Sequence, residues 1–282
     1  MVSVQLGAAL STTLFHAVTP AGSLWLRVTV AALILLALTR PSLRALPRST
    51  LLSLLALGVL TAAMMLTFIE SVARIPLGTA AAIQFAGPLM LAALKGRRRS
   101  AFIWPVLALV GVLALTQPWA GALNWAGIGF ALASAAGWAG YIVLTQHVGD
   151  RLPGFQGLAV SLAICAVVIA PIGAPAAIAG ATPGVALEAL GLAILIPLLP
   201  FSLELVALRR MTVPAFGTLM AVEPAVATAI GLLVLAQSPN LLQVLGVALV
   251  VAAGIGAQRP HADIRFIPSG SGLNRMSMEK PT

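Results

Sequence analysis

The chain has 282 residues, of which 60% are hydrophobic and only 8% are charged, and its mean hydropathy is strongly positive at +1.05. Because a soluble domain carries about 25% charged residues, this composition excludes a water-soluble fold. The net charge of +9 would suit a nucleic-acid partner, but the basic residues are spread over short connections and a tail instead of one face, so we expect no such partner.

The apolar segments are long enough to cross a lipid bilayer as helices. Several approach the roughly 20 residues that a helix needs to cross about 30 Å of hydrocarbon, and none alternates like a membrane strand. Breaks at Pro, Gly and charged residues predict an all-α, polytopic membrane bundle of ten transmembrane helices. Their predicted ranges are 2–18, 23–39, 50–73, 77–94, 101–116, 125–145, 157–172, 187–208, 214–235 and 241–257.

The first two predicted helices carry polar residues near their outer and inner ends. The first is short for a crossing and contains Gln5, so we expect it to be truncated, with an upstream start that adds apolar residues. The second carries Arg27 about one turn from its outer end. A guanidinium there can bind a carboxylate through two hydrogen bonds or reach the lipid headgroups, and both alternatives stay open.

The third, fourth and sixth predicted helices add further candidates. Glu70 precedes Arg74 by four residues, which is the spacing of an ordinary helical ion pair. Gln84 is a neutral polar group near the bilayer midplane of the fourth helix. Trp138 and Tyr141 share one face of the sixth helix. They line a cavity, or else they pack the helix and anchor it at the membrane interface.

Two carboxyl groups stand out in the eighth and ninth predicted helices. Glu204 lies about one turn from the cytoplasmic end of its helix, where it can act in binding, or snorkel and pair with Arg209 or Arg210. Glu223 lies about ten residues into its helix and precedes Pro224, which frees a backbone carbonyl group. An ionisable group at that depth indicates a site for a polar substrate or a proton. The alternative is a protonated glutamate that bonds a neighbouring helix for packing.

The basic residues orient the bundle. With a cytoplasmic amino terminus, all Lys and Arg residues except Arg27 and Arg74 fall in cytoplasmic connections or in the tail. Such residues resist translocation, so we expect a bacterial-type inner-membrane protein with both termini in the cytoplasm.

An internal repeat is also detectable. Arg74 aligns with Arg210, and Pro88 aligns with Pro224, at one constant offset. The repeat predicts two inverted five-helix units, which are typical of carriers with alternating access. Their predicted ranges are residues 1–120 and 121–257, followed by a disordered tail over 258–282.

Sequence motifs of enzymes and of metal sites are missing. The chain has no His-Glu-x-x-His zinc motif, no aspartate-rich metal motif and no Walker lysine loop. We therefore expect a protein that is not an enzyme and uses no metal and no cofactor. From a different class, an intramembrane enzyme or a membrane scaffold is the alternative, and turnover without movement of substrate would favour the enzyme.

Six segments carry a resemblance to a known family. They are Leu26-Arg27-Val28, Ile75-Pro76-Leu77-Gly78, Phe85-Ala86-Gly87-Pro88-Leu89, Gly137-Trp138-Ala139-Gly140-Tyr141-Ile142, Leu199-Pro200-Phe201-Ser202-Leu203-Glu204 and Phe216-Gly217-Thr218-Leu219-Met220-Ala221-Val222-Glu223-Pro224. On these segments the chain resembles the drug/metabolite transporter superfamily, EamA branch, and within it the threonine/homoserine exporters. The resemblance runs over nearly the whole helical region.

The resemblance implies a secondary transporter with ten helices in two inverted repeats. It implies export of small amino acids or related metabolites from a cytoplasm-open cavity in exchange for protons, with a broader drug or metabolite exporter as the alternative. In that scheme Arg27 takes the substrate carboxylate, Glu204 and Glu223 take the ammonium group or the proton, and Gln84, Trp138 and Tyr141 line the path. Gln84 stands where the exporters have a glutamate, which argues against a scheme with two carboxylates there.

Overall fold

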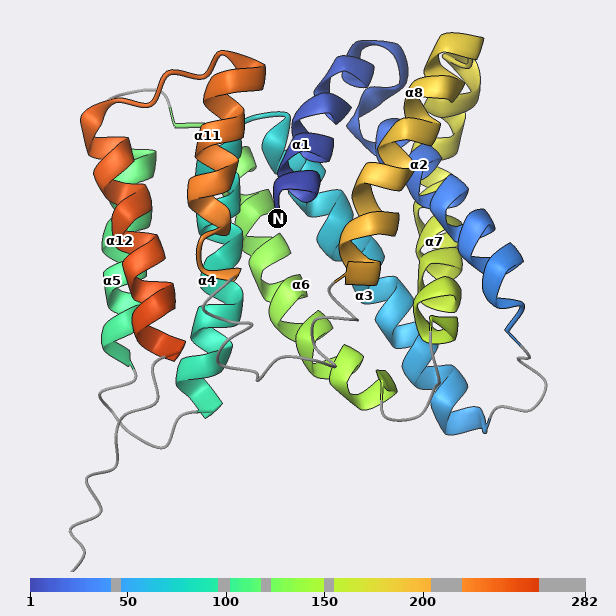
Figure 1. The fold of residues 1–282 in the computed structure, drawn as a ribbon, viewed down its shortest axis with the longest axis horizontal. Helices are drawn as coiled ribbons and strands as arrows, with labels where there is room; N and C mark the ends of the chain where they lie inside the picture. The colour runs from blue at the N-terminus through green and yellow to red at the C-terminus, as the bar shows by residue number, and fades with distance from the viewer. Residues whose placement is uncertain (42–46, 96–101, 118–122, 150–154, 204–219, 259–282) are drawn as a thin grey trace, which may run out of the picture.

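The computed structural model describes residues 1–41, 47–95, 102–117, 123–149, 155–203 and 220–258, and the regular structure in these ranges is helical, as predicted. The helices form one elongated bundle (Figure 1). Five helical stretches in the described ranges are long and apolar enough to cross a membrane, and four shorter apolar helices accompany them. In chain order the elements are α1 (Val2–Ser11), the 3-10 turn η1 (Thr12–Leu14), α2 (Phe15–Thr39), α3 (Arg48–Val72), α4 (Leu77–Lys95), α5 (Ile103–Thr116), α6 (Trp125–Gly149), α7 (Gln156–Ala179), α8 (Pro183–Ala193), the π-helical segment η4 (Ile194–Leu198), α11 (Glu223–Leu235) and α12 (Leu241–Gln258).

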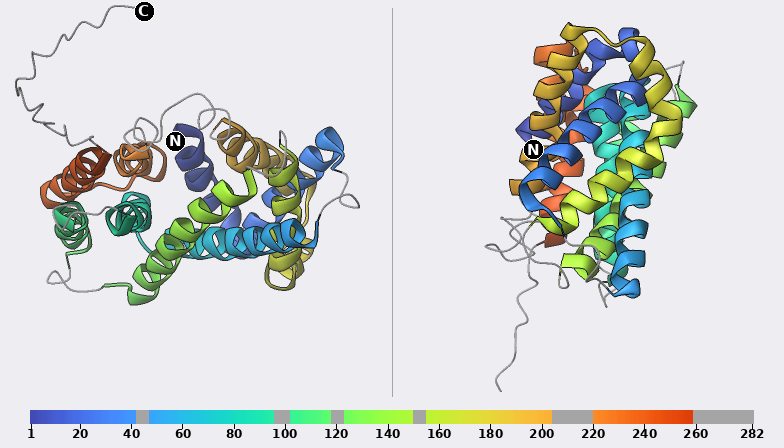
Figure 2. Two further views of the ribbon diagram at one scale, coloured as in Figure 1. Left: turned by 90° about the horizontal axis from the view of Figure 1, so that it is seen from below. Right: turned by 90° about the vertical axis from the view of Figure 1, so that its right-hand side faces the viewer.

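Helices far apart in the sequence pack side by side. α2 packs along α7 at one end of the bundle and α5 packs along α12 at the other end, with α4 and α11 packed together between them (Figure 2). α1 lies between α11 and η4 (Figure 1), while α6 packs against both α3 and α4. The largest apolar core joins α2, α3, α6 and α7, and Cys165 is buried in it, as the apolar run around it predicts.

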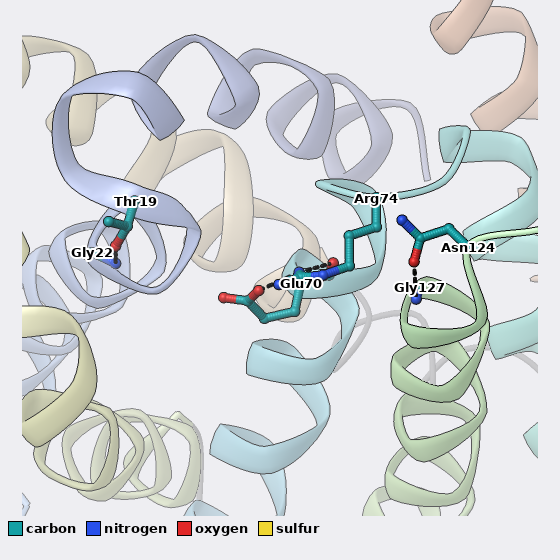
Figure 3. A network of polar contacts seen from close by, with 6 residues as sticks. All are labelled: Thr19, Gly22, Glu70, Arg74, Asn124 and Gly127. Carbon is teal, nitrogen blue, oxygen red and sulfur yellow. Dashed lines mark hydrogen bonds and ion pairs between the residues drawn. The ribbon is translucent and has the colours of Figure 1, made fainter.

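A single residue, Thr19, separates the first two predicted helices. Its φ of 61° breaks the helical path, and its hydroxyl oxygen accepts a hydrogen bond from the Gly22 backbone N–H at 3.2 Å (Figure 3). Pro20 follows in the first helical position, where its missing N–H costs nothing. The prediction of a connection as long as residues 19–22 is therefore wrong, because residues 20–22 already belong to the second helix.

Two further helix boundaries near prolines differ from the prediction. α7 continues past Pro171 and Pro175 to Ala179, although the sequence predicts an end at residue 172. Membrane helices tolerate such prolines where local backbone adjustments satisfy the freed backbone groups, and both prolines lie at exposed positions of α7. α8 begins at Pro183 and not at residue 187, because the Thr182 side chain caps its first turn.

Gly111 of α5 and Gly246 of α12 bring two backbones together. A methyl group added at either glycine would lie 2.7 Å from the carbonyl oxygen of the other. Gly→Ala in a helix ordinarily stabilises by about 0.5–1 kcal/mol. We expect Gly111→Ala instead to destabilise the protein by about 1–3 kcal/mol, because the helices must separate, and thermal unfolding in detergent checks this.

The matched control is Gly129→Ala on α6, where nothing lies within 4 Å of the added methyl group. This variant should unfold no earlier than the unchanged protein. An unfolding temperature for Gly111→Ala that equals the control's would contradict the close packing of α5 on α12.

Candidate functional site

A cavity of about 80 Å³ opens among helices from both halves of the chain. Its polar lining residues are Arg27 of α2, Gln84 of α4 and Glu223 of α11. The rest of the lining is apolar or aromatic and comprises Val4, Met64, Met65, Phe68, Trp138, Tyr141, Ile196, Phe201 and Met220. Charged groups in a low-dielectric setting are costly unless something compensates them, so this cavity is where chemistry is expected.

Arg27 is buried, with only 1% of its surface exposed. Its Nη1 donates to the Ser11 hydroxyl oxygen at 2.6 Å, and that hydroxyl donates to the Gly7 carbonyl oxygen at 2.6 Å. The Arg27 Nε is buried without a hydrogen-bond partner. Among the described residues no carboxylate forms an ion pair with the guanidinium. Within the described ranges, Arg27 is thus a buried cation that is held in place by a neutral group and has no ionic partner.

Glu223 occupies the first turn of α11, with Val222 as the N-cap residue and Pro224 next to it. The predicted helix is interrupted just before Glu223, because residues 221–222 form a turn between the helical residue Met220 and α11. Pro224 explains the local structure, since a proline cannot donate to the carbonyl four residues earlier and is favoured at a helix start. The prediction for residues 214–219 lies outside the described part of the chain.

Gln5 of α1 contacts this carboxyl group directly. The Gln5 Nε2 donates to the Glu223 Oε1 at 2.9 Å, and both side chains are buried. The other two oxygens of the pair, Gln5 Oε1 and Glu223 Oε2, are buried without hydrogen-bond partners. The α1–α11 contact therefore offers two acceptors that a donor would satisfy.

Gln84 joins a second interhelical hydrogen-bond chain. Its Nε2 donates to the Ser134 hydroxyl oxygen of α6 at 2.7 Å, and that hydroxyl donates to the Met64 carbonyl oxygen of α3 at 3.0 Å. The Gln84 side chain is half-buried and reaches the cavity from α4. Three helices are thus tied together beside the cavity.

Aromatic rings form part of the cavity wall. Tyr141 stacks on Phe201, with ring centroids 6.0 Å apart, and Trp138 meets Phe85 edge to face at 6.3 Å. Such pairs hold the rings in defined positions. Trp138 and Tyr141, which were predicted to share one face of their helix, both line the cavity.

The structure brings five of the six candidate residues to this one cavity, namely Arg27, Gln84, Trp138, Tyr141 and Glu223. The sixth, Glu204, lies outside the described residues, as does Arg210 of the aligned repeat. Gln5, Ser11 and Ser134 are the partners that sequence reasoning did not select. Their only signal is that each is polar within an apolar helix, and many such serines and threonines serve packing.

Arg74 and Glu70 lie outside this cavity lining. They form the predicted i,i+4 ion pair at the end of α3, which confirms that interpretation (Figure 3). The Arg74 guanidinium also lies 4.9 Å from the centre of the Phe130 ring. These contacts explain Arg74 as a structural residue.

An apolar helical bundle around a cavity that is lined by buried ionisable groups is the architecture of a membrane transport protein. Comparison with known proteins agrees with this class, and the chain belongs to the EamA-like transporter family, whose model matches residues 125–256. It is therefore a multi-pass membrane protein, and the resemblance seen in the sequence is confirmed.

Relatives with assigned names are similar over most of the chain. The threonine/homoserine exporter RhtA of Salmonella typhimurium strain LT2 is 36% identical over 262 residues, which cover 91% of this chain and 88% of that protein. RhtA of Escherichia coli strain K12 is 36% identical over 267 residues, with the same coverage of 91% and 88%. A protein known from a crystal structure shares the fold with a TM-score of 0.59 at 19% identity, covering 91% of this chain and 94% of that one.

Proposed function

We propose that this chain exports small neutral amino acids of the threonine and homoserine kind across the bacterial inner membrane. The observation that carries the proposal is the cavity, in which a buried guanidinium and a buried carboxyl group lack ionic partners among the described residues. An amino acid brings an anion and a cation on one small molecule, and it would compensate both groups at once. The relatives named as threonine/homoserine exporters support the same substrate class.

Each candidate residue has a distinct role in this proposal. Arg27 binds the substrate carboxylate, and Ser11 orients the guanidinium through its hydrogen bond. Glu223 receives the ammonium group or a proton, and its unpaired Oε2 is the acceptor for either. Gln84, Trp138 and Tyr141 line the path. Glu204 stays a prediction from the sequence for a second carboxylate nearer the cytoplasm.

Proton exchange is the proposed driving force. Glu223 is the one carboxyl group of the described cavity lining, so it is the candidate to bind a proton when the cavity faces one side and release it when the cavity faces the other. Substrate and proton then alternate at one site. The lipid bilayer is the remaining partner, because exposed apolar side chains cover the bundle.

The proposed architecture is ten helices in two inverted five-helix repeats. The packing pattern supports it. In the two repeats α1 corresponds to α6, α2 to α7, α3 to η4, α4 to α11 and α5 to α12, and replacing each helix by its counterpart turns observed contacts into other observed contacts. α2 on α7, α4 on α11 and α5 on α12 each map onto themselves, and α4 on α6 maps onto α11 on α1. α3 on α6 likewise maps onto η4 on α1. Such a pseudo-two-fold layout suits a carrier whose halves rock about a shared site.

The proposed orientation places both termini in the cytoplasm. We expect reporter fusions after Arg99 and within the tail to report the cytoplasm, and one after Trp119 to report the outside, because Lys and Arg cluster on the cytoplasmic side. Paired alkaline phosphatase and fluorescent-protein fusions make the measurement. A periplasmic signal from the tail would contradict an even number of crossings.

Counterflow in proteoliposomes tests the substrate. Vesicles loaded with unlabelled threonine should accumulate labelled threonine or homoserine, whereas empty vesicles should not. The panel should also hold aromatic amino acids, since the three methionines of the lining, Met64, Met65 and Met220, could adapt to larger side chains. Equal counterflow across the panel would favour the broader drug or metabolite exporter, and no counterflow of any amino acid would overturn the proposal.

A further inference from the structure

We propose that Gln84, held by Ser134, recognises the side-chain hydroxyl group of the substrate by accepting its hydrogen bond. This inference rests on the proposed function, because it concerns how the same cavity distinguishes a hydroxylated amino acid from an apolar one of equal size. It assigns a specificity-determining role to Gln84 and a positioning role to Ser134, which does not line the cavity.

The argument begins with the single proton of the Ser134 hydroxyl group. That proton is donated to the Met64 carbonyl oxygen, at 3.0 Å, so the Ser134 oxygen is left to accept. What it accepts is the Gln84 Nε2, at 2.7 Å. The amide of Gln84 therefore directs its nitrogen to Ser134, and one of its two N–H groups is used in that bond. Its carbonyl oxygen is not used there, and we assign this oxygen as the acceptor that Gln84 contributes to the cavity lining.

The helix packing holds this arrangement rigidly. Ser134 is fully buried, and the chain of bonds ties α4 to α6 and α6 to α3. Gly87, about one turn after Gln84 on α4, allows the close approach, because a methyl group there would lie 2.0 Å from the Ala135 carbonyl oxygen of α6. A side chain anchored in this way recognises hydrogen-bond direction with little loss of freedom on binding.

The remaining lining sharpens the selection. Apart from Arg27, Gln84 and Glu223, the side chains that reach the cavity are apolar or aromatic. Among these aromatic residues, Trp138 carries an indole N–H and Tyr141 a hydroxyl group. If Arg27 and Glu223 engage the charged groups of the amino acid, Gln84 is the amide whose oxygen can accept from the substrate side chain. A substrate without a donor would cover the Gln84 oxygen and leave it without a hydrogen bond, which is costly in a site that excludes water.

Matched pairs of amino acids test this selection in the counterflow assay. Threonine and valine have the same shape and differ by a hydroxyl for a methyl group, and we expect threonine to exchange about tenfold better at limiting concentration. O-Methylhomoserine and norleucine are a second pair of equal shape, and here the ether oxygen can accept but cannot donate. We expect O-methylhomoserine to exchange no better than norleucine.

Two variants and a control test whether the threonine preference depends on Gln84 and on its hydrogen bond to Ser134. Gln84→Met keeps the length of the side chain without the acceptor, and it should exchange threonine and valine equally well. Ser134→Ala should reduce the threonine preference to about twofold to threefold, because the freed amide can turn either way. Ser161→Ala removes another buried hydroxyl, which bonds only within α7, and it should keep the full preference.

The outcomes separate this inference from the proposed function. Exchange of threonine and valine at equal rates by the unchanged protein would overturn the inference and leave amino-acid export standing. A full threonine preference in Gln84→Met would do the same. A preference for O-methylhomoserine over norleucine that disappears in Gln84→Met would show that Gln84 donates, which also overturns it. If the unchanged protein exchanged no amino acid at all, that result would instead overturn the proposed function.

Discussion

Exchanging Arg27 for methionine should lower threonine counterflow about 30-fold or more, because removing one partner of a buried charge pair costs about 2–5 kcal/mol. The folded bundle should be at least as stable as before. In the absence of substrate the guanidinium has no carboxylate partner in the described residues, and its Nε has no hydrogen bond. An apolar side chain of similar length relieves that cost. Counterflow and thermal unfolding, measured on the same preparation, check both halves of the prediction.

The control for this variant is Arg74→Met. Arg74 pairs with Glu70 at a partly exposed position, so counterflow should stay within about twofold. Threonine counterflow by Arg27→Lys should lie between the values for Arg27→Met and Arg74→Met, since lysine keeps the charge but cannot form two parallel bonds to a carboxylate. A large loss of thermal stability in Arg27→Met would contradict the binding role and indicate that Arg27 holds the fold.

Exchanging Glu223 for glutamine should abolish transport driven by a pH gradient, while threonine exchange at equal pH continues at a lower rate because the amide oxygen still accepts from the substrate ammonium group. The amide cannot release a proton, so coupling is lost. The fold should tolerate the change well, because a glutamine at this position can accept from the Gln5 Nε2 and also donate to the unpaired Gln5 Oε1. Uptake of labelled threonine into vesicles, with and without an imposed pH gradient, separates the two activities.

Two other carboxyl groups provide the comparison. Glu188 of α8 is exposed and bonds Thr13, so Glu188→Gln should leave both activities unchanged. Glu204→Gln tests the second carboxylate expected from the sequence in the same assay. Unchanged pH-driven transport in Glu223→Gln, at normal expression, would retire the coupling role. Loss of equal-pH exchange as well would instead assign Glu223 to substrate binding.

The sequence by itself determined the class of fold, the family and most of the polar candidates at the cavity. Every backbone polar group in hydrocarbon must be satisfied within the protein, so long apolar runs without the alternation of membrane strands are predicted to be helices. For the same reason a polar side chain in such a run is conspicuous, and Arg27, Gln84 and Glu223 could be selected one at a time. Local chemistry is sufficient for such conclusions.

Helix ends were harder to predict from the sequence, because a proline in a membrane protein can stand either at the start of a helix or inside one. At Pro20 and Pro224 it occupies the start of a helix, whereas at Pro171 and Pro175 it lies inside one. Burial does not separate the two cases, because Pro171 and Pro175 are exposed whereas Pro224 is buried. The sequence around each proline therefore leaves its place in the helix open.

Only the tertiary structure decided which polar groups meet. Gln5 and Glu223 are 218 residues apart in sequence and form a hydrogen bond, and Ser134 reaches both Gln84 and the Met64 carbonyl group from a third helix. Helical periodicity tells which residues share a face, but the rotation of one helix against another is set by the packing of many side chains together. For that reason Gln5, Ser11 and Ser134 resembled ordinary packing residues until the helices were assembled around the cavity.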